Sequence, residues 1–351
     1  MPTYSRLDHA LQLMRQQATV YQPTSFWATA SQGITDELNQ QGVEAFRRLK
    51  SALTFFVPNY GAPASGLSVA QIALLEQTLK NNYPDAVKAG LSLNRAISGY
   101  QSALADYRVL QASEQAGRLP ELLGFSESQV GEPVEQWQWG QQHYSRSALN
   151  YLLGLSFLKK HLNGEVPRTL LEIGGGFGTL GEIWSQSGIP DWQYIDIDIP
   201  PTQFVADYYL RQILGDQHVS GFDDLAAGTT VDIASLKKAA VLCSWQIEQL
   251  QGTVDLFVNF ISFQEMEPDV VQNYLHHVDR LQTRWVLLRN MREGKQLKRE
   301  GHAGVTTPIK TDDYQHMLPN YQLIDRNVHP FGFETVDGFH SELMLFKRQA
   351  P

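Results

Sequence analysis

The sequence predicts an α/β protein in which an all-helical region, residues 1–146, precedes a domain, residues 147–351, built on a mostly parallel sheet. Three observations predict this. From about residue 165 onward, apolar runs alternate with helical patterns, which is typical of a sheet covered by helices on both faces. The chain closes with two strand-like runs and no helix between them, so an antiparallel hairpin is expected. Before residue 147, apolar residues recur three and four positions apart, and β-rich runs with period two are lacking.

The N-terminal region is expected to form several separate amphipathic helices. Four segments have apolar residues at helical spacing, namely 7–18, 43–57, 68–83 and 92–113. Loops rich in proline and glycine separate them at 58–66 and 120–133. A further amphipathic helix, 147–162, leads through Gly164 and Pro167 into the first strand.

The sheet is expected to contain five parallel strands and the closing hairpin. The parallel strands are the apolar runs 169–173, 192–197, 240–244, 254–263 and 285–290. The hairpin pairs 321–329 with 340–348 across a loop that carries Gly332 and Gly338. Such a sheet binds ligands at the carboxyl ends of its strands.

Composition excludes some classes of partner. The chain has 28 basic and 37 acidic residues and a net charge of -9, which opposes non-specific binding to nucleic acid or to an anionic membrane surface. Cys243 is the only cysteine, so neither an intrachain disulfide nor a cysteine-based zinc site is expected, in agreement with a reducing compartment. There is no signal-peptide core and no run of eighteen apolar residues. We therefore expect a soluble cytoplasmic protein, and no metal site is predicted.

The stretch LLEIGGGFGTLG, at the end of the first strand, fits two cofactor templates. Gly176, Gly178 and Gly181 spell the G-x-G-x-x-G of a dinucleotide site. Glu172, Gly174, Gly176 and Gly178 spell the E-x-G-x-G-x-G that opens many S-adenosylmethionine (SAM) sites. Glycines let the backbone approach either ligand closely. Their spacing therefore leaves both cofactors open.

The carboxylate at the mouth of this loop favours SAM. Glu172 would repel the pyrophosphate of a dinucleotide, whereas the sulfonium and ammonium groups of SAM match its charge. A nicotinamide-dependent oxidoreductase remains the alternative enzyme class.

Further cofactor contacts are expected after the second and third strands. A carboxylate at the end of the second strand can accept hydrogen bonds from both ribose hydroxyls. Asp198 is the first choice for this role and Asp196 the second. Ser244 and Trp245 follow the third strand, where adenine contacts are expected.

Four stretches together resemble one family. LLEIGGGFGTLGEIW, YIDIDIPP, DLFVNFISFQEM and HSELMLFKR look like the sugar O-methyltransferases, a family of class I SAM-dependent methyltransferases. The resemblance runs from about residue 165 to 348 and extends weakly upstream into SFWATASQGI and GVEAFRRLK. It implies a Rossmann-like methyltransferase domain, SAM as the methyl donor, and an acceptor hydroxyl on a saccharide or similar small metabolite.

Methyl transfer to a hydroxyl benefits from a base within hydrogen-bond reach. Glu265, in the run SFQEM after the fourth strand, is the first candidate, although a carboxylate at a helix N-terminus explains it equally well. His302, in a loop flanked by glycines, is the second. Gln264, Asn290 and Lys295 are predicted acceptor contacts.

The segment just before residue 147 is rich in aromatic residues. His143 and Tyr144, with Trp137 and Trp139, are expected to contact the acceptor or to cap the cofactor, and a buried helix junction explains them nearly as well. The helical region is also a candidate dimer interface, so a homodimer is one state that the sequence allows. A methyltransferase-like protein that binds SAM without turning it over is a further alternative.

Overall fold

A nine-stranded sheet organises the computed structural model, which describes residues 4–61, 69–82, 97–226, 228–299, 304–335 and 338–349. Its strands lie in the order β11-β13-β10-β9-β3-β4-β7-β5, and β12 pairs with β13. They are β3 (Thr169–Ile173), β4 (Gln193–Asp198), β5 (Val219–Gly221), β7 (Ala239–Cys243), β9 (Leu256–Phe260), β10 (Trp285–Met291), β11 (Tyr321–Asn327), β12 (Phe333–Glu334) and β13 (His340–Arg348).

The pairing of these strands confirms the predicted fold class. In the spatial order of the sheet, every pair of adjacent strands from β5 through β7, β4, β3 and β9 to β10 is parallel. Strand β13 runs antiparallel to both β10 and β11. A parallel sheet that ends with an antiparallel strand inserted between the last two is the Rossmann-like sheet of class I methyltransferases. The two runs predicted as the closing hairpin are β11 and β13.

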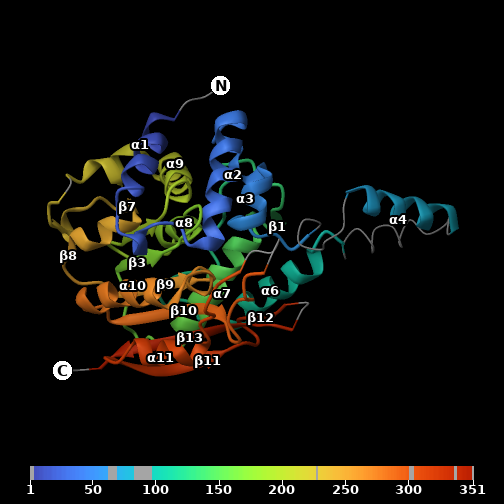
Figure 1. Ribbon diagram of the computed structural model, residues 1–351. Coiled ribbons are helices and arrows are strands. Elements are labelled where there is room, and N and C mark those ends of the chain that lie inside the picture. The colour runs from blue at the N-terminus through green and yellow to red at the C-terminus, as the bar shows by residue number, and fades with distance from the viewer. Residues whose placement is uncertain are drawn as a thin grey trace.

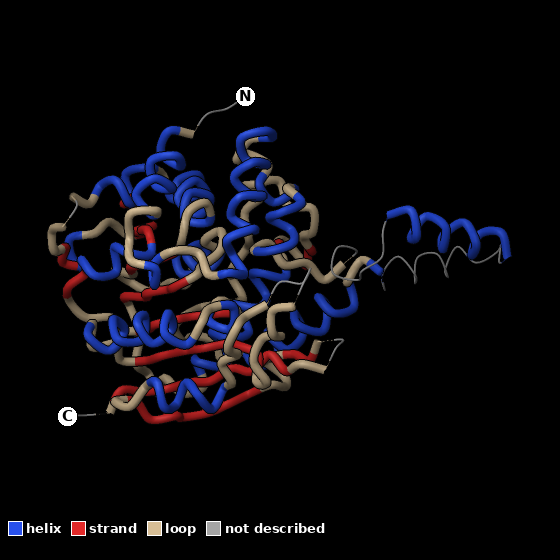
Figure 2. The backbone as a smooth tube through the Cα atoms, viewed as in Figure 1, coloured by secondary structure: helices blue, strands red, loops and turns tan. Residues whose placement is uncertain are grey.

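Helices cover both faces of the sheet, as the layers in Figures 1 and 2 show. The α-helices are α1 (Ser5–Met14), α2 (Ser25–Gln41), α3 (Lys50–Phe55), α4 (Val69–Asn82), α6 (Tyr100–Ser113), α7 (Arg146–Lys159), α8 (Thr179–Ser185), α9 (Thr202–Leu214), α10 (Pro268–Arg280) and α11 (Thr311–Met317). Short 3-10 turns are η1 (Thr19–Tyr21), η2 (Phe46–Arg48), η3 (Asp216–His218), η4 (Phe222–Asp224), η5 (Ile233–Ser235), η6 (Ser244–Gln249) and η7 (Phe263–Glu265). No described helix combines the length and apolar character needed to cross a bilayer.

Two main hydrophobic cores lie on opposite faces of the sheet, because successive side chains along a strand point to opposite faces. In β10, Leu287 packs with the helices on one face, where α7, α8 and α9 lie, and Leu288 packs with α10 and α11 on the other. Because both faces are covered, the parallel strands read as continuous apolar runs.

The N-terminal region is not all-helical, in contrast to the prediction. It also contains a two-stranded antiparallel hairpin, β1 (Trp137–Trp139) and β2 (Gln142–Tyr144). Two further short strands, β6 (Val231–Asp232) and β8 (Leu250–Gln251), pair away from the main sheet. These strands are two or three residues long, too short for period-two alternation to reveal them. Helix α4 extends away from the rest of the described chain (Figure 1).

The predicted boundary near residue 146 is crossed by the hydrophobic core. Phe177, in the glycine loop, lies 5.4 Å from Phe46 and 5.1 Å from Tyr209, between ring centroids. The guanidinium of Arg47 lies 4.9 Å from the Phe177 ring and pairs with buried Glu127 at 3.1 Å. The helical region therefore packs directly on the loop predicted to hold the cofactor, and its division as a separate domain remains a prediction.

Candidate functional site

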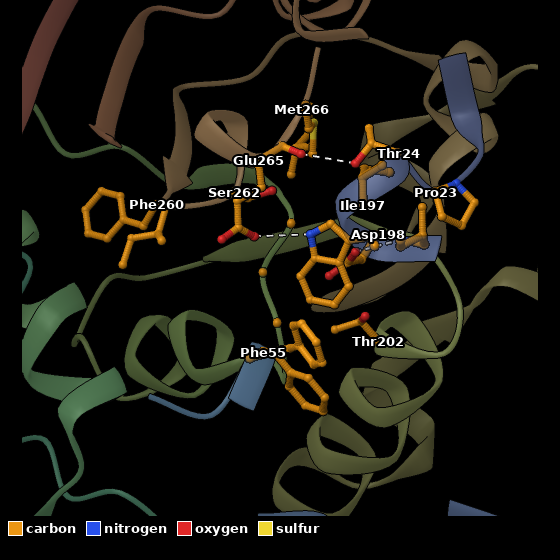
Figure 3. A pocket seen from close by; sticks show the side chains of 18 of the residues that line it. Pro23, Thr24, Phe55, Ile197, Asp198, Thr202, Phe260, Ser262, Glu265 and Met266 are labelled. Carbon is orange, nitrogen blue, oxygen red and sulfur yellow. Dashed lines mark hydrogen bonds between the residues drawn. The ribbon is translucent and has the colours of Figure 1, made fainter. Parts of the chain in front are cut away.

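A cavity lies at the carboxyl ends of β3, β4 and β9 (Figure 3). The strand order reverses at this point, because the chain proceeds from β3 to β4 and β7 on one side and from β9 to β10 on the other. Such a switch point is where open α/β sheets bind ligands. The N-terminal segment around η1 and the start of α2 supplies another wall, with Val20, Pro23 and Trp27.

The glycine turn after β3 forms the floor of this cavity. Gly174, Gly175 and Gly176 line it, and Gly176 has φ 63°, a conformation that side chains disfavour. A Cβ on Gly175 would lie 2.6 Å from Asp196 Oδ1 and 2.8 Å from Glu172 Oε2. The turn therefore presents backbone to the cavity and packs closely over two carboxylates. Gly178, the last glycine of the E-x-G-x-G-x-G pattern, is the N-cap of α8.

Glu172 lies behind the turn and does not line the cavity. Its fully buried carboxylate accepts hydrogen bonds from Tyr151 Oη at 2.7 Å and Tyr194 Oη at 2.6 Å. Burial raises the pKa of Glu172 to about 7. Tyr151, which holds one oxygen of this carboxylate, itself lines the cavity. Direct contact between Glu172 and a cofactor stays a prediction.

Of the two aspartates at the end of β4, Asp198 is the one that lines the cavity. Its Oδ1 accepts a hydrogen bond from the Ile199 amide at 2.7 Å, and burial, with the nearby charge of Glu172, raises its pKa to about 7. Asp196 is fully buried; its Oδ1 accepts from the Gly175 amide at 3.3 Å, and its Oδ2 has no partner among the described residues. This geometry is consistent with the choice of Asp198 for a ribose contact, which stays a prediction.

The predicted adenine contacts lie outside the cavity wall. Ser244 donates a hydrogen bond to the Tyr21 carbonyl at 2.7 Å, and half-buried Trp245 packs against the core. Val270 and Tyr274 of α10 line this part of the cavity instead. No motif in the sequence marks these two residues, because they lie on a helix with an ordinary amphipathic pattern.

Glu265 lines the cavity at the end of η7 and is 7% exposed. Its Oε1 accepts from Lys295 Nζ at 2.8 Å, and its Oε2 accepts from Trp27 Nε1 at 3.1 Å. Its backbone carbonyl accepts from Thr24 Oγ1 at 3.1 Å (Figure 3). Burial raises the pKa of the Glu265 carboxyl, and the neighbouring ammonium of Lys295 opposes this rise.

The predicted acceptor contacts separate into two groups. Lys295 reaches the cavity wall through Glu265, whereas Gln264 and Asn290 are buried behind it. The backbone N–H of Gln264 donates to Asn290 Oδ1 at 3.1 Å, and Asn290 Nδ2 donates to Asn259 Oδ1 at 3.3 Å. These amides tie the ends of β9 and β10 together.

The aromatic segment before α7 is packed away from the cavity. Buried Tyr144 lies 5.8 Å from Trp139 and 5.3 Å from Tyr107, between ring centroids, and half-buried His143 belongs to β2. Neither predicted contact lines the cavity. His302, the second predicted base, lies outside the described residues.

The structure adds cavity residues that sequence reasoning missed. Trp27 of α2, Phe55 of α3 and the adjacent Phe56 form an apolar wall, and Asn150 of α7 adds a polar group. The stretch SFWATASQGI, which contains Trp27, carried only a weak resemblance. Aromatic residues in a helical region are ordinarily core, so their spacing alone does not mark a site.

The polar side chains that line the cavity suit an organic cofactor with hydroxyl and ammonium groups. Besides Asp198, the cavity is lined by Thr202, whose buried Oγ1 has no hydrogen-bond partner among the described residues. Buried polar groups normally have partners, so this hydroxyl fits a ligand contact. Across the described ranges, no three His, Cys, Asp or Glu side chains are grouped in a way that could hold a metal ion.

Comparisons with known proteins give structural likeness only. No protein-family model matches the chain, and no curated protein matches it significantly. It is similar to a SAM-dependent methyltransferase from Aquifex aeolicus, with 14% identity over 55% of this chain and 89% of that one and a TM-score of 0.36. It is similar to magnesium protoporphyrin IX methyltransferase (ChlM) from Synechocystis, with bound S-adenosylhomocysteine (SAH), at 14% identity over 60% and 90% of the two chains and a TM-score of 0.38.

A third solved structure, the mitomycin 7-O-methyltransferase MmcR, aligns over 94% of this chain and 74% of its own, with 12% identity and a TM-score of 0.36. These TM-scores are low, so the assignment of the fold rests on the strand order of the sheet.

Proposed function

We propose that this protein is a SAM-dependent O-methyltransferase that transfers a methyl group to a hydroxyl of a sugar or sugar-containing small metabolite. The observation that carries the proposal is the cavity at the switch point. There a glycine turn, the carboxylate of Asp198 and the buried carboxylate of Glu265 meet in the sheet of a class I methyltransferase.

The charges around the cavity support SAM rather than a dinucleotide. Glu172 is buried beneath the glycine turn, and half-buried Asp198 lines the cavity beside it. When ionised, they would repel a pyrophosphate and attract the positive groups of SAM. The antiparallel β13 between β10 and β11 points the same way, because dinucleotide-binding sheets end on parallel strands.

The residues suggest how the chain would hold the two reactants. Asp198 would accept hydrogen bonds from the ribose, and the Thr202 hydroxyl would donate one to it. The turn from Gly174 to Gly176 has no side chains, so it would let the amino-acid end of SAM approach the backbone. SAM supplies an electrophilic methyl group when it is bound. The remaining task is to bring a hydroxyl into line with that group.

Glu265 is the candidate base for the acceptor hydroxyl. Its carboxylate lines the cavity and is held by two donors on separate elements, Lys295 and Trp27. A buried carboxylate with a raised pKa is better suited to accept a proton than an exposed one. The proton of the acceptor hydroxyl would pass to the Glu265 carboxylate as the oxygen bonds to the methyl carbon, while the methyl–sulfur bond of SAM would break and leave SAH.

Incubation with methyl-labelled SAM and a panel of saccharides tests the proposal. Transfer of label to a saccharide hydroxyl is expected, and Glu265→Gln should keep SAH affinity while losing about 100-fold or more in turnover. Unchanged turnover in this variant would remove Glu265 from the mechanism. Binding of SAM without transfer to any acceptor would favour the non-catalytic alternative.

A further inference from the structure

One residue of the N-terminal region contacts the candidate base and also lines the cavity. Trp27 lies in the first turn of α2, shortly after Val20 and Pro23, which also line the cavity. Its indole nitrogen donates a hydrogen bond to Glu265, and its half-buried ring lies 5.9 Å from Phe55 between centroids. The same side chain therefore has a polar edge on the carboxylate and an apolar surface in the wall.

The start of α2 is fixed to this place by several independent contacts. Thr24, the N-cap of α2, donates to the Glu265 carbonyl, and Phe26 lies under Lys295, whose Nζ is 4.7 Å from the ring centroid. Before it, Tyr21 is buried, and its hydroxyl donates to Glu248 at 2.7 Å. The position of Trp27 is therefore determined in part by contacts of the residues that precede it in the chain.

These contacts orient the carboxylate. Lys295 donates a hydrogen bond to one oxygen of Glu265, and Trp27 donates one to the other. The plane of the carboxylate is therefore held by two donors from separate parts of the chain. A carboxylate has about four lone-pair sites, so two remain for a hydroxyl proton. Lys295 can rotate and is half-buried, whereas the indole is rigid, so Trp27 is the more restrictive of the two donors.

On this basis, and resting on the proposed function, we propose that Trp27 forms the acceptor subsite together with Phe55. The indole face holds the apolar face of a saccharide ring, and the indole N–H positions the Glu265 carboxylate at the hydroxyl to be methylated. Trp27 is thus a wall of the acceptor subsite and a positioning residue for the base. The aromatic surface expected at 137–144 is supplied instead by α2 and α3.

The residues proposed for the acceptor and those proposed for the cofactor come from different parts of the chain. Trp27 and Phe55 belong to the N-terminal helices, whereas Asp198 and the glycine turn belong to the sheet. A change at Trp27 should therefore affect the acceptor and the base, and leave cofactor affinity nearly unchanged.

Indole NMR on the full-length protein, with its seven tryptophans labelled with ¹⁵N, tests this assignment. The Trp27 signal is identified by its loss in Trp27→Phe, and the Trp245 signal by its loss in Trp245→Phe. With SAH bound, methyl glycosides should shift the Trp27 signal and leave that of Trp245, which lies outside the cavity wall, in place. The Trp27 signal should also titrate with pH in wild type and not in Glu265→Gln.

Steady-state kinetics with a glycoside that accepts the methyl group provide the second readout. Trp27→Phe keeps a ring and loses the N–H, so we expect kcat to fall about tenfold and the pH profile to move, with KM nearly unchanged. Trp27→Leu should also raise KM, and SAH affinity should stay within about threefold in both variants.

The results that would overturn the inference are distinct from those that would overturn the proposed function. Failure of wild type to bind SAH contradicts the function. Normal SAH binding, with a Trp27 signal that no methyl glycoside moves, contradicts the acceptor subsite. A loss of SAH affinity of more than about tenfold in Trp27→Phe would place Trp27 at the cofactor instead.

Discussion

At the scale of single residues, the two neighbouring carboxylates of β4 have different surroundings. Asp198 lines the cavity, whereas Asp196 is enclosed behind the glycine turn. The sequence DID places them on the same side of the strand, so alternation alone could not separate them. The difference arises because Asp198 is the last residue of β4 and Asp196 lies beneath Gly175.

This difference predicts opposite outcomes for matched substitutions. Asp198→Asn should weaken SAH binding by about 10- to 100-fold, because hydrogen bonds to a charged group contribute roughly 1.5–3 kcal/mol. Asp196→Asn should leave affinity within about threefold, since its carboxylate does not reach the cavity. Isothermal titration calorimetry measures both. Equal losses in the two variants would contradict the assignment of Asp198 to the ribose.

Glu172 should make stability depend on pH. Its pKa is raised to about 7 by burial, whereas in the unfolded chain it titrates near its ordinary value of 4.5. Between these values the folded protein holds a proton that the unfolded chain has lost, so stability falls as pH rises, by at most roughly 1.4 kcal/mol per pH unit. Melting temperatures from about pH 5 to pH 7.5 should therefore decline in wild type.

The matched variant Glu172→Gln cannot titrate at this position. Its melting temperature should decline less steeply over the same window, and the difference from wild type measures the contribution of Glu172, including its effect on the Asp198 carboxyl. Parallel curves for the two proteins would show that Glu172 is already ionised across the window.

At the scale of elements, the glycine turn between β3 and α8 depends on one close approach. Gly175 has an ordinary φ, so alanine there is opposed by crowding alone, against Asp196 and Glu172. Gly175→Ala should lower the free energy of unfolding by about 1–3 kcal/mol and weaken SAH binding, because the turn must move. Gly124→Ala is the control, since a Cβ there meets no atom within 4 Å. Denaturant unfolding that is unchanged in both variants would contradict the packing described for the turn.

The main elements could be predicted from the sequence because their signals are strong and local. The run 169–173 coincides with β3, and 340–348 coincides with β13. By contrast, the helix predicted over 43–57 is broken into η2 and α3, because residues 43–57 bend to pack on the glycine loop. Periodicity reports which face is apolar and does not report such bends.

At the scale of the whole molecule, the helical region and the sheet share one hydrophobic core. Phe177 is 1% exposed and packs on Phe46 of the N-terminal region. The cavity likewise combines strand ends with side chains from α2 and α3. The glycine turn and Asp198 could be found from sequence because local motifs mark them. Trp27 and Phe55 could not, since their role depends on how distant segments pack.

This shared core predicts cooperative unfolding. Phe177→Ala should cost about 3–5 kcal/mol in unfolding free energy, and wild type should unfold in a single calorimetric transition. Leu123→Ala, at a 39% exposed side chain, is the control and should change stability by no more than about 0.5 kcal/mol. Two well-separated transitions in wild type would show that residues 1–146 fold independently.

We propose that the switch-point cavity binds SAM and its product. Calorimetric titration of the wild-type chain with SAH, and separately with NADH, tests it most directly. We predict saturable binding of SAH at a single site per chain and no binding heat with NADH. Saturable binding of NADH without binding of SAH would contradict the claim.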